Sequence, residues 1–339
     1  MGSKKRDIRI EFIRGLSMFI ICIYHYSCAL EIKNIEEGWR PLWHFASSSW
    51  GAVFVIVFFM ISGYVMMIQY SDSLDIKSFY KKRWVSIFPM FYIAWGIMYV
   101  VRAIQYKNPL WGGKPSLLIL SLLGMDGYLK NGTNNYYTVG EWFLGAIIIL
   151  YILFPLLRLI YKKNHIVFTI IMIFIFFLFE AFGVIEQCKR TDIFFCIFSF
   201  WCGMIFWKYR ESAKKSIVII SALIIWNVMY FVDCRDFFNE ITIMHMMGIS
   251  AFILFYSLPI ETICKNKKLE NIISFLSKYS YPVMLVHHVL VYWGIKACQL
   301  IGIHPNIGIF FIIIGIYIAA VCFDKITKPL IFRITKNLR

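Results

Sequence analysis

The segment IRIEFIRGLSMFIICIYHY, residues 8–26, determines the class of this protein. Its apolar character continues to about residue 30, and a membrane-crossing helix needs about 20 mostly apolar residues. Basic residues precede it, as in a secretory signal. However, the segment is too long for a signal, contains Arg14, and is not followed by a small-residue cleavage site. We therefore predict a first transmembrane helix over residues 10–30.

The rest of the chain has the same apolar composition. Of its 339 residues, 60% are hydrophobic and only 16% are charged, against about 25% charged residues in soluble domains. The net charge of +16 would suggest nucleic acid in a soluble protein. Here the basic residues form short clusters between apolar runs, which is typical of cytoplasmic loops and indicates no nucleic-acid partner. The composition predicts an all-α polytopic membrane protein surrounded by lipid, with residues 1–339 forming a single integral membrane domain.

Ten segments are long and apolar enough to be candidate spans. They cover roughly residues 10–30, 50–70, 85–105, 141–161, 166–185, 193–208, 216–232, 241–259, 281–301 and 307–325. The stretch 116–125 is apolar but too short to cross a membrane, and we predict that it belongs to a structured loop.

Lysine and arginine then set the orientation. If the first span runs outward, the inner loops hold about three times as many basic residues as the outer loops. This bias alternates from loop to loop, so it favours about ten helices with both termini in the cytoplasm. The longest outer loop, about residues 106–140, combines amides with aromatic residues. That composition suits sugar contact and also suits a flexible loop with interfacial aromatic residues.

Arg14 and His25 are the polar residues of the first span that most favour a function. They are 11 residues apart, which at 100° per residue is three turns plus about 20°, with a rise of about 16 Å. Both side chains therefore lie on nearly one face, with Arg14 toward the cytoplasm. Glu11 lies one turn before Arg14 and is placed to pair with it.

This pair suits acyl transfer from an anionic donor. Arginine stays charged and binds anions, whereas histidine can take a proton from a hydroxyl near neutral pH. A coenzyme A thioester has a phosphate-rich head and a long arm ending in the acyl group, which fits the spacing. The alternative is structural, with Arg14 reaching the inner headgroups and His25 making a helix contact.

Other polar positions are weaker candidates. His287 and His288 are adjacent, so they point about 100° apart and only one could face the cavity that His25 faces. His245 is a lone histidine that we expect in the core. Ser62 and Gly63 mark a close approach of helices. Glu141 and Trp142 lie at the outer face, where Glu141 would contact an acceptor or simply be solvated. The nine cysteines have no metal-ligand spacing, so we predict no metal site.

Five blocks of the sequence together resemble the acyltransferase-three family of integral membrane O-acyltransferases. The first segment, with Arg14 and His25, is similar to the Arg-x10-His signature of that family. The other blocks are FVIVFFMISGYVM, FYKKRWVSIFPMFY, GEWFLGAIIILYILFPLL and SKYSYPVMLVHH, in the family order. Two positions depart from the pattern, because Glu11 replaces the usual aspartate and Ser86 replaces a common second arginine. The esterase-like domain of some members is also missing from the sequence.

The resemblance implies transfer of an acyl group, usually acetyl, from cytoplasmic acyl-CoA to a hydroxyl of an extracytoplasmic glycan or lipid-linked sugar. It implies His25 as the catalytic histidine, Arg14 as its partner, and Arg83 with Lys82 near the donor. Acetyl-CoA would be a substrate, with no permanently bound cofactor. The remaining blocks carry Ser62, Gly63, Trp142 and His287, with supporting roles. The resemblance also implies a bacterial inner membrane.

Three alternatives stay open at this stage. A glycan or lipid-linked sugar transporter, or a non-catalytic membrane component, would also have many spans and buried charges. A different acyl group, such as succinyl, would leave the enzyme class unchanged. General-base catalysis by His25 and a covalent acyl-histidine are both compatible with the residues. The sequence does not determine the acceptor sugar, its hydroxyl or the oligomeric state.

Overall fold

The computed structural model describes residues 7–129, 134–189 and 191–335. The chain divides into two compact units, which it enters more than once. The first unit holds the described residues of 1–34, 40–73 and 154–280, and the second holds those of 35–39, 74–153 and 281–339. The helices α6 (Glu141–Ala181) and α11 (Lys267–Leu300) each contribute to both units.

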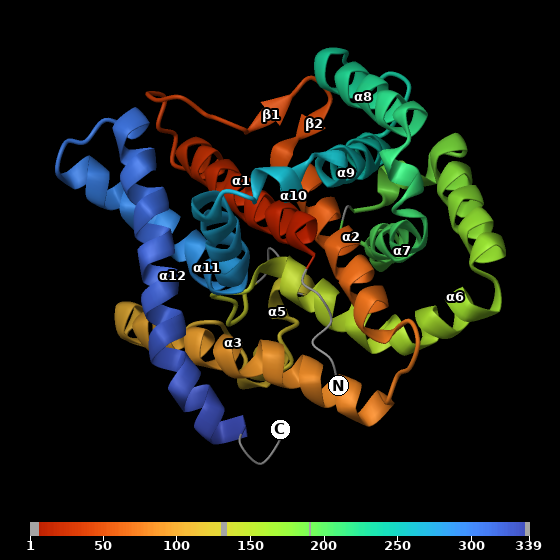
Figure 1. Cartoon of the computed structure of the whole chain (residues 1–339). Helices are drawn as coiled ribbons and strands as arrows, with labels where there is room; N and C mark the ends of the chain where they lie inside the picture. The colour runs from red at the N-terminus through yellow and green to blue at the C-terminus, as the bar shows by residue number, and fades with distance from the viewer. Residues whose placement is uncertain (1–6, 130–133, 190, 336–339) are drawn as a thin grey trace. The chain divides into compact units, whose positions relative to one another are not determined.

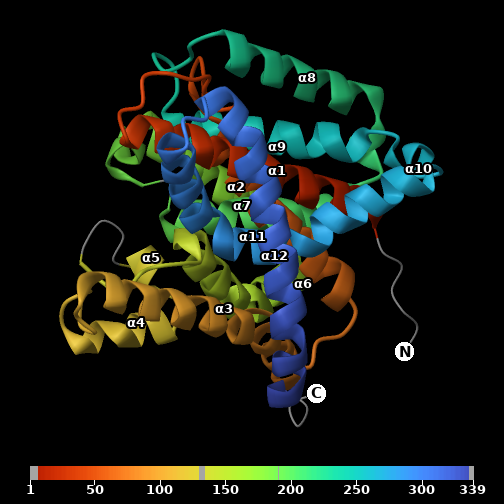
Figure 2. The ribbon, with the colours of Figure 1, turned by 90° about the vertical axis from the view of Figure 1, so that its left-hand side faces the viewer.

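The first unit is built around α2 (Trp50–Tyr70), an apolar helix that is largely buried. It contacts α1 (Ile8–Ile32), α7 (Ile193–Tyr209) and α9 (Glu240–Ser257), as Figure 1 shows. α8 (Ser216–Phe231) runs beside α9, which is clearest in Figure 2. The shorter elements of this unit are η2 (Val184–Gln187), η3 (Ser212–Lys214), α10 (Ile260–Ile263) and a two-stranded antiparallel hairpin, β1 (His44–Phe45) with β2 (Ser48–Ser49), in which His44 pairs with Ser49.

Glycines let α2 and α7 cross with their backbones in contact. A Cβ on Gly63 of α2 would overlap the carbonyl oxygen of Phe200, and a Cβ on Gly203 of α7 would overlap that of Met60. Each glycine thus lies against the backbone of the other helix. The prediction of a close helix approach at Gly63 is confirmed, and such contacts through small residues are how membrane helices gain packing energy.

The second unit contains α3 (Ile76–Tyr106), the first part of α6, the second part of α11, and α12 (Pro305–Thr335). α12 contacts α3. The outer segment predicted as a structured loop folds into η1 (Pro115–Leu117), α4 (Leu118–Leu122) and α5 (Asp126–Leu129). Figure 2 shows α4 beside α3, and Tyr92 of α3 donates a hydrogen bond to the Leu122 carbonyl. The prediction of a short, folded apolar stretch here is confirmed.

Local capping explains several helix boundaries. Asp7 accepts hydrogen bonds from the backbone N–H groups of Arg9 and Ile10 and so caps α1, as expected for aspartate at an N-cap. α6 breaks at Asn164, which has non-helical angles and accepts a hydrogen bond from the Val167 N–H. This break lies between the two spans predicted over residues 141–161 and 166–185.

Seven of the described helices are long and apolar enough to cross a membrane, counting the bent α6 once. α7 and α8 are apolar but shorter, with 17 and 16 residues. The mainly helical membrane protein predicted from the sequence is therefore confirmed. The count of ten spans and the position of the termini stay predictions.

Replacing Gly63 or Gly203 by alanine should destabilise the first unit, because each new methyl group meets backbone atoms that cannot rotate away. We expect a loss of at least about 1–3 kcal/mol, the cost of overpacking a close-packed core. Gly96 and Gly315 are matched controls, since a Cβ on either meets nothing within 4 Å. Thermal unfolding in detergent should show lower Tm values for G63A and G203A than for the two controls. Equal Tm values in all four variants would contradict the crossing.

Candidate functional site

Arg14 and His25 lie on one continuous helix in the first unit. α1 runs without interruption from Ile8 to Ile32, so the predicted offset of about 20° and rise of about 16 Å apply. Both side chains are half-buried. The His25 ring packs edge-on against the Tyr24 ring, with centroids 5.2 Å apart. The shared helix face predicted for this pair is therefore present.

Glu11 is buried near the N-terminal end of α1, one turn before Arg14. Its side chain is 7% exposed, and Ser274 of α11 lies 3.5 Å from its carboxylate as a hydrogen-bond donor. Gly15, next to Arg14, lets α11 approach closely, because a Cβ there would stand 2.8 Å from Leu276 Cβ. The N-terminal part of α11 thus supports α1 at the level of Arg14. Pairing of Glu11 with Arg14 stays a prediction.

A polar network at the start of α1 was missed by the sequence analysis. Tyr64 is buried, with 1% of the residue exposed. Its hydroxyl donates to the Asp7 carboxylate at 2.9 Å and lies 2.9 Å from the Tyr256 hydroxyl. Arg9 stacks over the Tyr256 ring and forms an ion pair with Glu261 at 3.0 Å. Asp7 therefore ties α1 to both α2 and α9 while it caps α1. The partners are about 57 and 249 residues away in the chain, so no local pattern could have revealed them.

Ser62 makes a local contact. Its hydroxyl donates to the Phe58 carbonyl one turn earlier, at 3.0 Å, which satisfies the group within α2. The predicted supporting role of Ser62 is untested by this contact. His245 of α9 is 2% exposed and lies among the rings of Phe176, Phe195 and Phe198, in agreement with the predicted core position.

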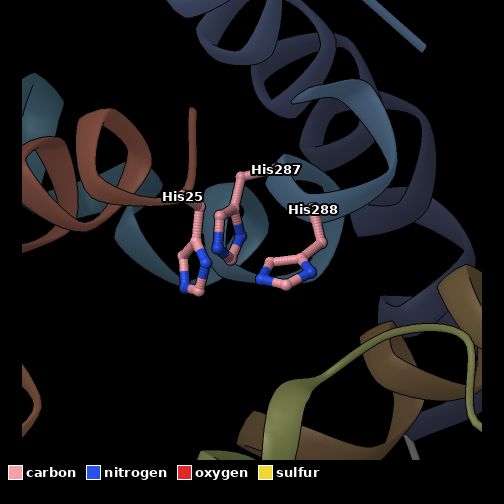
Figure 3. Close-up of side chains that lie close together, drawn as sticks. All are labelled: His25, His287 and His288. Atoms are coloured by element: carbon pink, nitrogen blue, oxygen red, sulfur yellow. The ribbon is translucent and has the colours of Figure 1, made fainter. Parts of the chain in front are cut away.

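His287 and His288 lie side by side on α11, in the second unit. Figure 3 shows both imidazoles, whose centroids are 5.0 Å apart and nearly perpendicular, and also His25 on α1. His287 is 1% exposed, and its Nδ1 lies 3.1 Å from the Val283 carbonyl and 2.9 Å from the Met284 carbonyl. Only a protonated nitrogen can bond to carbonyl oxygens, so Nδ1 carries the hydrogen. In the neutral ring, Nε2 is then the basic atom.

The predicted donor-side residues also lie in the second unit. Arg83 of α3 is half-buried, with its guanidinium 5.6 Å from the Tyr151 ring centroid and 6.0 Å from that of Phe79. Lys82 is exposed. Glu141 is the first residue of α6, and Trp142, its second, is half-buried. The first unit thus holds Glu11, Arg14, His25, Ser62 and Gly63, and the second holds Lys82, Arg83, Glu141, Trp142 and His287.

A comparison with models of protein families identifies the family of this chain. Residues 7–325 match the model of an acyltransferase domain. The chain belongs to the acyltransferase-3 family of membrane O-acyltransferases. The family match begins at Asp7, includes every predicted site residue, and makes the protein an acyltransferase and a multi-pass integral membrane protein. No curated protein and no solved structure was found to match the chain.

In this acyltransferase, aromatic residues pack together in the segment between α3 and α6, which the sequence predicts as an outer loop. Tyr136 is fully buried and contacts the ring of Trp111 edge-on, with centroids 5.4 Å apart. Its hydroxyl donates to the Gly113 carbonyl, and its own carbonyl accepts from the Trp95 indole N–H. Burial raises the pKa of Tyr136. These rings pack on one another, whereas Tyr106, stacked on Trp111, keeps 56% of its surface exposed. Residues 130–133 of the predicted sugar-contact loop lie outside the described residues.

A buried carboxyl group lies in the same loop of the acyltransferase. Asp126 is 2% exposed, accepts a hydrogen bond from the Ser121 hydroxyl at 2.7 Å, and accepts another from the Gly127 N–H. Burial raises the pKa of this carboxyl group, although the two hydrogen bonds act in the opposite direction. Its ionised form is therefore less favourable in the folded loop than in the unfolded chain.

The pH dependence of stability should reveal Asp126. A carboxyl group whose pKa is raised by folding favours the folded state at low pH, and this contribution is lost as pH rises through the folded pKa. Asp126→Asn keeps a carbonyl acceptor for Ser121 and Gly127 but cannot ionise. We expect the difference between the Tm of D126N and that of the wild type to shift in favour of D126N as pH rises from 4 to 8. A Tm difference that does not change with pH would contradict the raised pKa.

Proposed function

We propose that this acyltransferase moves an acetyl group from cytoplasmic acetyl-CoA to a hydroxyl of an extracytoplasmic or lipid-linked glycan. The observation that carries the proposal is the shared face of α1, which holds a permanent cation near one end and an imidazole about three turns away. The membership of the acyltransferase-3 family supports the acyl-transfer chemistry.

The proposed topology supplies the two substrates from opposite sides. Ten spans with both termini in the cytoplasm would put Arg14 near the inner surface and His25 toward the outer third. The bias of lysine and arginine toward the inner loops supports this orientation. We place the protein in a bacterial inner membrane, where acyl-CoA is available on the cytoplasmic side and surface glycans are assembled on the other.

The reaction breaks the thioester C–S bond and forms an ester C–O bond. His25 takes the proton of the acceptor hydroxyl while the hydroxyl oxygen attacks the acyl carbon, and the proton then passes to the departing thiolate of coenzyme A. In the alternative route, His25 first accepts the acyl group and then delivers it to the acceptor. In both routes Arg14 holds the phosphates of the donor. Arg83 and Lys82 add positive charge for the same head group.

Membranes that contain His25→Ala should fail to transfer label from acetyl-labelled CoA to the host's surface glycan. Loss of the imidazole removes the proton acceptor in either route, so we expect a loss of at least about 100-fold, the lower end of general-base catalysis. The measurement is label in the glycan at matched expression. A denaturing quench during wild-type turnover separates the two routes, since only the covalent route leaves label on the protein.

Transfer by H25A at the wild-type rate would remove His25 from the mechanism. The deciding variant would then be His287→Asn, because asparagine keeps a donor near the position of Nδ1 and removes the basic Nε2. A panel of other acyl-CoA donors, including succinyl-CoA, separates a wrong acyl group from a wrong mechanism.

Arg14→Lys should weaken donor binding more than turnover. Lysine keeps the charge but cannot bond two phosphate oxygens in the planar, two-point manner of arginine. We expect a higher KM for acetyl-CoA, by about tenfold, with kcat close to that of the wild type. An unchanged KM with a strongly reduced kcat would instead place Arg14 at the reacting carbonyl group.

A further inference from the structure

The N-terminus of α2 is buried but lacks a side-chain cap. Ser49 occupies the N-cap position, and serine there usually accepts a hydrogen bond from the second or third N–H of the helix. In this protein Ser49 makes no such bond. Its side chain is buried, with 2% of the residue exposed, and Oγ has no partner among the described residues.

Backbone donors at the same helix end are also available. The first N–H groups of any α-helix have no acceptor within the helix. The Trp50 N–H bonds to the Trp43 carbonyl, and the N–H groups of Gly51 and Ala52 follow it in the first turn of α2. Gly51 is buried and Ala52 is 6% exposed, so their N–H groups lie away from bulk water. A buried helix end that combines backbone N–H donors, a positive dipole and the unpartnered Ser49 hydroxyl is suited to an anionic oxygen.

This helix end lies next to His25, within the first unit. The Tyr24 ring packs directly against Gly51, where a Cβ would overlap the ring. The same ring also packs against His25, at 5.2 Å between centroids. The Tyr24 ring therefore contacts both the imidazole and the first turn of α2.

Hydrogen bonds fix the segment that leads into α2. Ser27, two residues after His25, donates to the Pro41 carbonyl at 2.7 Å. Ser47 donates to the Val232 carbonyl and accepts from the Cys234 N–H, and Ser48 donates to Glu240. The segment before the hairpin is thus tied to α1, and the hairpin itself is tied to the connection between α8 and α9 and to the first residue of α9. Donors held in place before the reaction are the kind that stabilise a transition state well.

We infer that the N-terminus of α2 is the oxyanion site of this enzyme, formed by the N–H groups of Gly51 and Ala52 and the hydroxyl of Ser49. The inference rests on the proposed function, in which His25 handles the acyl group. When the nucleophile attacks the acyl carbon, the π electrons of the C=O bond move onto oxygen. The three donors stabilise this oxyanion. The electron pair returns as the C–S bond breaks, and the thiolate leaves with the proton that His25 had taken.

Methylphosphonate is a suitable probe, because it is a tetrahedral anion with a methyl group, like the adduct of an acetyl group. We expect it to raise the Tm of the purified full-length protein in detergent. Ser49→Ala removes one donor and should weaken this binding about tenfold, in line with a hydrogen bond to a charged group. Ser199→Ala is the matched control, since Ser199 is also fully buried but donates to the Phe195 carbonyl of its own helix.

Ser49→Asp tests the site without relying on the folding of S49A. Its carboxylate would itself bond to the N–H groups of Gly51 and Ala52, so we expect a higher Tm and no further stabilisation by methylphosphonate. In the transfer assay, S49A should lower kcat by about tenfold or more and leave the KM for acetyl-CoA unchanged.

Three outcomes would overturn the inference. They are a wild type that methylphosphonate does not stabilise, an S49A variant that binds it like the wild type and S199A, and an S49A variant with unchanged kcat. If no acetyl transfer is detected with any acceptor, the proposed function fails. The Tm measurements with methylphosphonate still test the site. Stabilisation that depends on Ser49 supports an anion site at the N-terminus of α2, and a lack of such stabilisation refutes that site.

Discussion

The backbone crossing of α2 and α7 is the constraint on which the first unit depends. Gly63 and Gly203 each lie over a carbonyl oxygen of the other helix, so the two helices can approach in only one register. α2 then presents its other sides to α1 and α9, with Gly248 of α9 fitting against Ile56. Because α1 carries Arg14 and His25, the position of the proposed reactive face follows from this crossing. Apolar burial alone could not specify it, since lipid is as apolar as the helix surfaces.

Features with a local cause could be predicted from the sequence. The common face of Arg14 and His25 follows from helical periodicity, which operates within one segment. The break of α6 at Asn164 and the short helices of the outer loop follow from interruptions in the apolar pattern. The close approach at Gly63 was predicted for the same reason, because a small residue in a membrane helix marks a contact whichever helix is the partner.

Features that pair distant residues could not be predicted in this way. Nothing near Asp7 identifies Tyr64 and Tyr256 as its partners, and nothing near Gly63 identifies α7 as the crossing helix. The outer loop shows a second limit. Its composition indicated either sugar contact or flexibility, yet Tyr136 and Trp111 pack on each other and form the interior of the loop. The amino-acid types were informative, but whether each ring faces another ring or solvent depends on the fold.

The two ends of α2 differ in how their hydrogen-bonding groups are satisfied. We assign a structural role to one end and a functional role to the other. At the C-terminal end, the buried Arg158 of α6 donates to the carbonyl groups of Tyr70 and Ser71, and Lys162 donates to that of Asp72. A cation at a helix C-terminus satisfies both its hydrogen-bond acceptors and its dipole. At the other end, Ser49 is of the right type to cap the helix but does not. Because side chains satisfy the carbonyl groups at one end of α2, side chains could equally satisfy the N–H groups at the other end. A buried hydroxyl kept without a partner, as Ser49 Oγ is here, costs stability, and such a cost persists where the site has a ligand to bind.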